Sequence, residues 1–380
     1  MLVYVDMWTG DLVHERKLSG IRRYAERRGW SVLTLGDKES RPSRLLAFLE
    51  RVRSIGCIVE CSHGHNDLVP SLFAGIPTVY LDSPSNLRTG RMTRVVHDGR
   101  ATVQEAFREL SSLNPPAYAV VGHAVPYFWS QKRIRDFKSL ATKTGSKCFS
   151  FQVEGGRRSE ARQKALASWL KGLPRKTAVF AVNDVVATEV VAAGKRSHLR
   201  IPADLTLVGV DNCENVCETS DPKISSVQID FERAGYQAAL LVDGLISDRR
   251  VTSETFGPLM TVRRESTRGV GCCGPQMLKA IDLIRRDACN GLRARDVVKL
   301  FSCSRRLVDI RFREAFGHSI LDEILNVRFE SVFSLLSRTD VSLGTIAGRC
   351  GFGSEVTLRE QFRLRTGMSM GSWRKANVRR

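Results

Sequence analysis

The stretch VSLGTIAGRCGFGSEVTLREQFRLRTG, at residues 341–367, predicts two short helices joined by a tight turn. The helical spacing breaks at residues 350–352, and Ser354 stands where its side-chain oxygen can cap the second helix. The apolar residues that recur at helical spacing, and that we expect to be buried, are Leu343, Ile346, Ala347, Leu358 and Phe362. Two short helices that each bury one face indicate a helix-turn-helix unit.

The same design occurs about fifty residues earlier, in RARDVVKLFSCSRRLVDIRFREAFG at residues 293–317. A first helix stops at the SCS turn, and Ser304 can cap a second one. The inward positions of this unit are Val297, Val298, Phe301, Val308 and Phe312. Between the two units we predict one long helix over roughly residues 319–337, with its apolar stripe at Ile320, Ile324, Val327, Val332, Leu335 and Leu336.

Burial of one face of each second helix forces the other face outward. The expected outward side chains are Arg305, Arg306, Asp309 and Arg313 in the first unit, and Glu355, Val356, Thr357, Arg359, Glu360 and Arg363 in the second. A helix held in this way fits a DNA major groove of about 12 Å, where arginine reaches guanine. Two units on one rigid helix would read groove segments about 34 Å apart on double-stranded DNA.

This region resembles the DNA-binding domain of the AraC family over about a hundred residues. The matching marks are the LFSCS turn, FREAFG at 312–317, VSLGTIAGRCGFGS at 341–354, the position of Phe362, and GMSM followed by Trp373 and Arg374. The resemblance implies a transcription regulator, more often an activator, that contacts RNA polymerase. Two positions depart from the family pattern: Met370 stands where proline is usual, and Ile310 stands where a polar or basic residue is common.

The charge distribution favours the same region as the phosphate-binding surface. The chain has 380 residues, 59 Lys and Arg, 40 Asp and Glu, and a formal net charge of +19. Residues 274–380 hold 20 of the basic and 11 of the acidic residues, so their charge density is more than twice that of the rest. An excess of this kind indicates an anionic partner such as nucleic acid. A solvated basic face without a partner is the alternative.

Residues 1–262 show a different pattern, in which short apolar runs alternate with amphipathic stretches. The runs LVYV, WSVLTL, CIVE, TVYLD, YAVVG, TAVFAV and LTLVGVD predict strands. Because parallel strands need a long connection, this alternation predicts an α/β fold of two doubly wound lobes. Ligands bind such sheets at the carboxyl ends of strands, where Asn183 and Asp184 follow one run and Asp211 and Asn212 follow another. Each of these residues could instead only cap a helix.

The same region resembles the regulatory core of the LacI/GalR family, whose fold is similar to periplasmic sugar-binding proteins. The marks are VFAVNDVVAT at 179–188, IPADLTLVGVDN at 201–212 and ISSVQIDFERAGYQAA at 224–239, preceded by HDG at 97–99 and WSQKRIRDF at 129–137. The resemblance implies that a sugar binds between the lobes. It places ligand contacts on Arg133, Asn183 and Asp211, with Asp98 near the first crossover between lobes.

The residue chemistry suits a sugar. Arginine and carboxylate side chains can each bond two adjacent hydroxyls, and an amide both donates and accepts. Trp129, with Phe128 or Tyr127 as alternatives, could stack on the apolar face of the ring. Trp8 and Asp11 follow a strand end and are weaker candidates for the cleft.

Between the two regions, RRESTRGVGCCG has charge and glycine but no apolar period. We therefore predict a sensor domain at 1–262 without an amino-terminal helix-turn-helix, a linker at 263–274 and a DNA-binding domain at 275–380.

Several other classes are disfavoured. The chain has no apolar run of about 18 residues, and Asp6 interrupts any signal peptide, so we expect a cytoplasmic protein and no membrane partner. Cys57, Cys61, His63 and His65 lack the spacing of a zinc site, and neither the pair Cys213 and Cys217 nor the pair Cys272 and Cys273 forms a better one. No motif for a catalytic site or a cofactor occurs.

We therefore predict a homodimeric regulator, not an enzyme, controlled by a small sugar, with a pentose such as xylose first among the candidates. A transport-type binding protein would explain only the first region. A DNA-repair enzyme sharing the tail would need a better thiol cluster for its metal.

Overall fold

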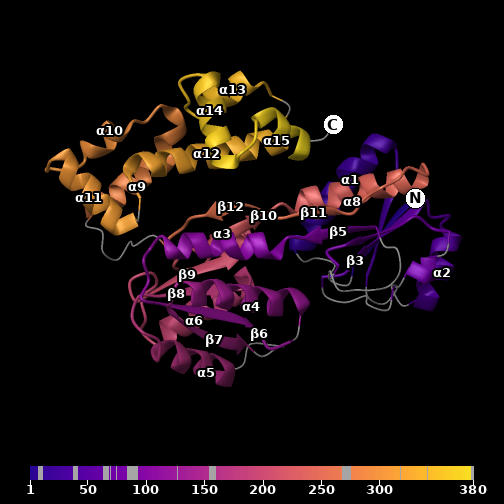
Figure 1. Cartoon of the computed structure of the whole chain (residues 1–380), viewed down its shortest axis with the longest axis horizontal. Helices are drawn as coiled ribbons and strands as arrows, with labels where there is room; N and C mark the ends of the chain where they lie inside the picture. The colour runs from indigo at the N-terminus through magenta and orange to yellow at the C-terminus, as the bar shows by residue number, and fades with distance from the viewer. Residues whose placement is uncertain are drawn as a thin grey trace. The chain divides into compact units, whose positions relative to one another are not determined.

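The computed structural model of the chain forms two compact units, residues 1–267 and 268–380, which we describe separately (Figure 1). The residues described are 1–6, 12–36, 42–62, 68, 70–73, 75–83, 93–125, 127–153, 160–267, 275–316, 318–339 and 341–377. Trp8 and Asp11 lie outside them. Within these residues, no helix is both long enough and apolar enough to cross a bilayer.

The first unit contains two six-stranded sheets, one in each lobe. The first sheet has the order β11-β5-β4-β3-β1-β2, and all its pairings are parallel. Its strands are β1 (Leu2–Val5), β2 (Val32–Leu35), β3 (Gly56–Glu60), β4 (Thr78–Leu81), β5 (Thr93–His97) and β11 (Glu254–Phe256). The strands β1 and β3 are buried along their whole length, as expected for parallel strands covered on both faces.

The helices of this lobe are α1 (Leu12–Arg28), α2 (Pro42–Arg51), α8 (Phe231–Ile246) and the 3-10 turn η1 (Pro70–Phe73). Helices α1 and α8 lie side by side (Figure 1). Their close approach depends on two glycines. A Cβ atom added at Gly20 would lie 1.9 Å from the carbonyl oxygen of Glu232, and one added at Gly235 would lie 1.8 Å from that of Lys17.

The second sheet has the order β12-β10-β9-β8-β6-β7. Its strands are β6 (Ala117–His123), β7 (Lys147–Val153), β8 (Thr177–Ala181), β9 (Leu205–Val210), β10 (Ser225–Ile229) and β12 (Pro258–Val262). Only the pairing of β12 with β10 is antiparallel. The helices of this lobe are α3 (Gly99–Ser111), α4 (Phe128–Lys143), α5 (Glu160–Lys171), α6 (Asp184–Arg196) and α7 (Glu214–Cys217).

The chain passes between the lobes three times: after β5, after β10 and between β11 and β12. The three passages lie together. The amide of Asp98 donates to the carbonyl oxygen of Phe256 over 2.7 Å, and the amide of Asp230 donates to that of Gly257 over 3.2 Å. The predicted two-lobed α/β fold is therefore confirmed.

The second unit contains helices and no strands within its described residues. Its elements are α9 (Pro275–Asp287), η3 (Ala288–Asn290), α10 (Ala294–Val298), α11 (Arg305–Phe316), α12 (Ile320–Arg338), α13 (Leu343–Arg349), α14 (Glu355–Thr366) and α15 (Met370–Asn377). Val308, Phe312, Leu358 and Phe362 are fully buried, so the predicted inward faces of the second helix of each unit are confirmed. In the first helices Val297, Ile346 and Ala347 are buried, whereas Val298, Phe301 and Leu343 are half-buried. The side chains of Ser319 and Asp322 form a capping box at the start of α12.

The start of the predicted linker belongs to the first unit. Arg264, Ser266 and Thr267 are buried, and Ser266 donates a hydrogen bond to the carbonyl oxygen of Leu207 in β9 over 2.6 Å. The polar composition of residues 263–267 suggested a linker, but Arg264, Ser266 and Thr267 are buried and hydrogen-bonded within the first unit.

Candidate functional site

The carboxyl ends of strands from both sheets meet at a cavity of about 60 Å³ in the first unit. The lining combines hydrogen-bonding side chains with a few apolar walls. Its members are Val13, His14, Lys17, Ser62, Asp82, His97, Trp129, Arg133, Asn183, Asp211 and Phe231. Four of the five sugar-site residues predicted from the sequence lie here together. A cavity with many polar groups and an aromatic wall suits a small polyhydroxylated ligand.

The second lobe contributes an arginine and a carboxylate. Arg133 on α4 is buried, and its Nη2 lies 3.8 Å from Oδ1 of Asp211, the residue after β9. Its Nη1 donates to the carbonyl oxygen of Val182 over 2.6 Å, whereas its Nε has no hydrogen-bond partner among the described residues. Because a buried donor without a partner is costly, a ligand oxygen is a suitable acceptor for this guanidinium.

Trp129 and Asn183 flank this pair. The guanidinium of Arg133 lies over the Trp129 ring, 5.1 Å from its centroid, and Tyr127 stacks on the same ring at 5.7 Å. Asn183 accepts a hydrogen bond from the amide of Val186 over 2.9 Å, so it caps α6. Asn183 is also among the residues that line the cavity. The two interpretations of Asn183 offered by the sequence are thus compatible.

The first lobe contributes a second cation with its own carboxylate. Lys17 on α1 has no exposed surface, and its Nζ lies 3.0 Å from both Glu60 and Asp82. Burial opposes ionisation of Asp82, but the charge of Lys17 outweighs it and the pKa of Asp82 is lowered. Each lobe therefore presents one cation and one carboxylate to the cavity.

The two histidines of the lining differ. Burial, followed by the charge of Arg133, lowers the pKa of His97 to about 3, so its ring is neutral near pH 7. Burial also disfavours a charge on His14, but its Nδ1 lies 2.6 Å from Asp6 and its pKa is raised. Because Lys17 and Arg133 already face the carboxylates of Asp82 and Asp211, the lining suits an uncharged ligand better than an anion.

A larger cavity of about 380 Å³ adjoins the first. The two share Asp82, His97, Trp129 and Arg133. Phe128 lines only the larger one. Of the three predicted aromatic candidates, Trp129 lines the smaller cavity and Phe128 and Tyr127 do not; Phe231 at the start of α8 adds a second aromatic side chain.

Asp98 differs from the other predicted sugar-site residues. It lines neither cavity, and its carboxylate accepts a hydrogen bond from the amide of Ala101 at the start of α3. It does lie at the first passage between the lobes. The Asp98 side chain caps the helix that follows it. The sequence alone did not distinguish this capping role from contact with a ligand.

Several lining residues escaped sequence reasoning. Ser62, Asp82 and His97 stand at or after the ends of β3, β4 and β5, so the strand-end rule that selected Asp211 could have found them. His14 and Lys17 carried no such signal, because a polar residue on the buried face of an amphipathic helix looks like an irregularity in the pattern.

The second unit presents the predicted outward face of α11. Arg305, Arg306 and Arg313 are exposed, and Asp309 is half-buried. Arg305 Nε lies 3.9 Å from Asp309. Ile310 is also exposed, at 44%, between the arginines. A cationic helix face with one apolar side chain can contact phosphates, base edges and a thymine methyl group.

The outward face of α14 resembles that of α11, but the order of its charge pair along the helix is reversed, with the acidic residue first. Val356, Thr357, Arg359, Glu360 and Arg363 are exposed, and Glu355 is half-buried. Ser354 caps the helix by accepting from the amide of Thr357 over 3.1 Å. Glu355 pairs with Arg359 at 2.5 Å, at the spacing that Arg305 and Asp309 use in α11. The two helices therefore present related surfaces with different charge patterns.

The possible metal ligands do not gather into a cluster within the described residues. Cys57 and Cys61 are buried thiols, and burial raises the pKa of both. His63, His65, Cys272 and Cys273 lie outside the described residues. The other candidate pair, Cys213 and Cys217, consists of free thiols.

Two family models match the chain. Residues 107–267 match the periplasmic binding protein-like domain, and residues 297–376 match the helix-turn-helix domain. The first match includes most of the second lobe and the whole of α8. The second runs from α10 to α15 and includes both helix-turn-helix units.

Curated proteins are similar to this chain over part of its length. The chain is 28% identical over 266 residues to the xylose operon regulatory protein of Escherichia coli strain K12, and 29% identical over 267 residues to that of Haemophilus influenzae. These matches cover 68% of this chain and 68% or 69% of the relative. A match to the transcriptional repressor PurR of Edwardsiella ictaluri is 26% identical over 238 residues, covering 59% of this chain and 67% of the repressor.

Solved structures show the same fold. A xylose-binding transcription activator aligns with a TM-score of 0.61 at 22% identity, covering 99% of this chain and 98% of that one. The ribose operon repressor of Lactobacillus acidophilus aligns with a TM-score of 0.58 at 20% identity, covering 71% of this chain and 98% of the repressor.

Proposed function

We propose that this chain, which joins a periplasmic-binding-protein-like core of the LacI/GalR type to a helix-turn-helix domain of the AraC type, is a transcription regulator whose DNA binding responds to a sugar. The observation that carries the proposal is the cavity where Arg133, Asn183, Trp129 and Asp211 meet. A sensor of this kind acts where the chromosome is, in the cytoplasm.

The proposed ligand is an uncharged aldose, with a pentose such as xylose as the first candidate. Adjacent hydroxyls can accept from the Nε of Arg133 and donate to Asp211, and the Trp129 ring can cover the apolar face of the sugar. Lys17 and Asp82 offer a second donor and acceptor from the other lobe. The pairing of Lys17 and Arg133 with carboxylates supports an uncharged ligand over an anion, and the names of the bacterial relatives support xylose.

The proposed DNA readers are the exposed faces of α11 and α14. Arg305, Arg306, Asp309 and Arg313 belong to the first, and Glu355, Thr357, Arg359, Glu360 and Arg363 to the second. We propose further that the protein acts as a homodimer, activates transcription and contacts RNA polymerase. A sugar can control these steps only if it binds more tightly to one form of the protein than to another.

The test uses the full chain and a duplex selected by that chain from genomic fragments. Binding of D-xylose, L-arabinose, D-ribose and D-glucose is measured by calorimetry, and duplex affinity is measured with and without each sugar. The proposal expects at least one sugar, xylose first, to bind and to change duplex affinity. A flat response to all four sugars would overturn the sensor, and equal affinity for random duplex would overturn the DNA reader.

A further inference from the structure

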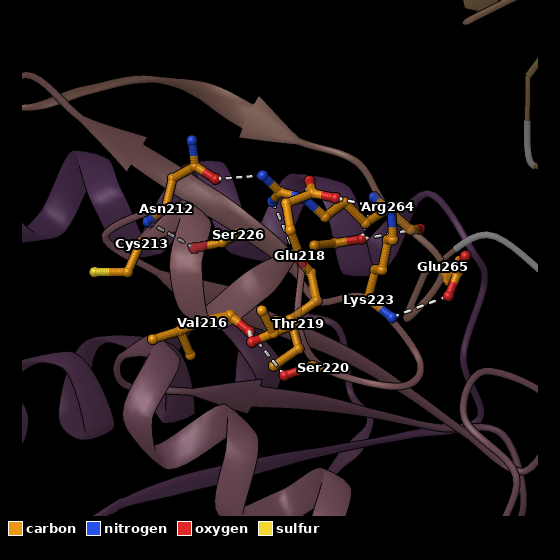
Figure 2. Close-up of polar contacts among 12 residues, drawn as sticks. Asn212, Cys213, Val216, Glu218, Thr219, Ser220, Lys223, Ser226, Arg264 and Glu265 are labelled. Carbon is orange, nitrogen blue, oxygen red and sulfur yellow. Dashed lines mark hydrogen bonds and ion pairs between the residues drawn. The ribbon is translucent and has the colours of Figure 1, made fainter.

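Arg264 lies near the end of the first unit in the chain and is hydrogen-bonded to the loop after β9 that lines the cavity. It follows the last strand of the first unit, β12, and its side chain is 8% exposed. Its Nη2 donates to Oδ1 of Asn212 over 2.8 Å, and its Nη1 donates to the carbonyl oxygen of Ile224 over 2.9 Å. Its Nε donates to Glu218. Figure 2 shows this guanidinium inserted among its partners.

The partner Asn212 belongs to the loop that presents Asp211 to the cavity. Asp211 and Asn212 both have positive φ, 101° and 48°, so this loop has a constrained backbone. The amide of Asn212 donates to Ser226 Oγ over 3.0 Å, as Figure 2 also shows. A change in the position of Asp211 therefore moves the residue to which Arg264 is bonded.

The chain beyond Arg264 is tied to the same strands. Ser266 accepts from the amide of Ser225 over 2.8 Å, and Thr267 Oγ1 lies 2.7 Å from Ser225 Oγ. Residues 268–274, which lead to the second unit, follow directly. The hydrogen bonds thus run from the Asp211 loop through Arg264 to the last residues before the connection.

The burial of the Arg264 charge is an argument for a role beyond packing. Taking a guanidinium out of water costs several kcal/mol unless every donor finds a partner, and an apolar residue would fill the same space without that cost. Asn212, Ser225, Ser226, Ser266 and Thr267 are buried as well. Polar networks of this kind hold discrete geometries and can transmit a local rearrangement.

We propose that Arg264 is a positioning residue that couples sugar contact at Asp211 to the segment leading into the DNA-binding unit. This inference rests on the proposed sugar-responsive function. Arg264 lines neither of the two cavities. It fixes the Asp211 loop through Asn212 and, through its own backbone, the exit of the chain from the first unit.

The test compares coupling with binding in the full chain. Calorimetry gives the dissociation constant for D-xylose, and fluorescence anisotropy gives the affinity for the selected duplex with and without D-xylose. Arg264→Ala and Asn212→Ala are each expected to keep both individual affinities within about threefold of the unmodified chain. The sugar-induced change is the ratio of the duplex affinities with and without D-xylose. In both variants this change should be at least fivefold smaller than in the unmodified chain.

The matched control is Arg263→Ala. Arg263 precedes Arg264 but pairs with Glu109 on α3 at 2.7 Å, away from the Asp211 loop, so this variant should keep the full sugar-induced change. Arg264→Lys, which retains the charge but not the planar fork, should restore part of the coupling. The double variant Asn212→Ala with Arg264→Ala should lose no more coupling than either single variant.

Full coupling in Arg264→Ala, or an equal loss in Arg263→Ala, would overturn the assignment. If Arg264→Ala does not fold, Asn212→Gly gives the decision alone, because glycine removes the acceptor and tolerates the positive φ of 48° at this position. A structural role alone would lower the melting temperature of Arg264→Ala while leaving the coupling unchanged. A flat response of the unmodified chain to every sugar would instead overturn the proposed function itself.

Discussion

The guanidinium of Arg16, on α1 in the first lobe, donates a hydrogen bond over 2.8 Å to the backbone carbonyl oxygen of Asp211 in the second lobe. Its other terminal nitrogen donates to the carbonyl oxygen of Asn212, also over 2.8 Å. The loop that offers a carboxylate to the cavity is thus held by a side chain from the opposite lobe. These bonds exist only while the lobes are close together.

Arg16→Ala is therefore expected to weaken sugar binding. A hydrogen bond contributes about 1 kcal/mol net, and about 1.4 kcal/mol corresponds to a tenfold change in affinity, so losing both bonds should raise the dissociation constant about tenfold or more. Calorimetry with D-xylose measures this. Arg22→Ala, an exposed arginine on the same helix, is the control. An unchanged dissociation constant in Arg16→Ala would mean that the lobes do not depend on this contact.

Replacement of Asp211 should separate the sugar response from DNA binding. Because φ at Asp211 is 101°, alanine there adds backbone strain that asparagine tolerates better, so Asp211→Asn tests the carboxylate more cleanly than Asp211→Ala. Both variants should lose sugar binding by at least tenfold and keep duplex affinity without sugar. Glu214→Ala, an exposed carboxylate nearby, should behave like the unmodified chain. Retention of sugar binding in Asp211→Asn would remove this carboxylate from the site.

The main features of the fold could be predicted from the sequence because they depend on periodicity. LVYV coincides with β1, and TAVFAV contains β8. The antiparallel pairing of β12 with β10 was not predicted, because a short strand at a sheet edge carries no signal of direction. Residues 263–267 were assigned to the linker for a similar reason. Composition shows that a segment is polar, but not that its polar groups find partners inside the protein.

The candidate site was predictable on one lobe and obscure on the other. Asn183 and Asp211 follow strand ends in motifs that resemble a known family, and both line the cavity. Lys17 and His14 come from a helix, and only the three-dimensional packing of α1 brings them to the cavity. Asp98 shows a different limit of prediction from sequence. A carboxylate before a helix can cap that helix or contact a ligand, and the sequence is the same in both cases.

Arg306→Ala tests base reading by α11. If Arg306 contacts a base, this variant should weaken binding to the selected duplex by about 1–3 kcal/mol and leave binding to random duplex nearly unchanged. If Arg306 contacts only phosphate, affinity should fall on both duplexes. The slope of log affinity against log salt concentration should then decrease in magnitude by about one. Fluorescence anisotropy at several salt concentrations separates the two outcomes. Arg285→Ala, an exposed arginine on α9, is the control and should change neither affinity.

The stability of the first unit should depend on pH through Asp184, which is 1% exposed. Its carboxylate accepts hydrogen bonds from Ser226 Oγ over 2.6 Å and from the amide of Cys213 over 2.8 Å. Burial, followed by the charge of Asp211, raises the pKa of Asp184 from 3.8 to about 7. The folded chain therefore keeps a proton that the unfolded chain releases, and this contribution to stability is lost as the pH rises through 7.

Between pH 5 and pH 8 the contribution of Asp184 to the free energy of unfolding should fall by about 2 kcal/mol. Asp184→Asn removes the titrating group while keeping the shape of the protonated side chain, so its stability relative to the unmodified chain should rise by that amount over the same range. Urea denaturation at four pH values measures the difference. Asp248→Asn changes an exposed aspartate. The difference in the free energy of unfolding between this variant and the unmodified chain should stay constant over the same pH range. A constant offset for Asp184→Asn as well would show that Asp184 is already ionised in the folded protein at pH 5.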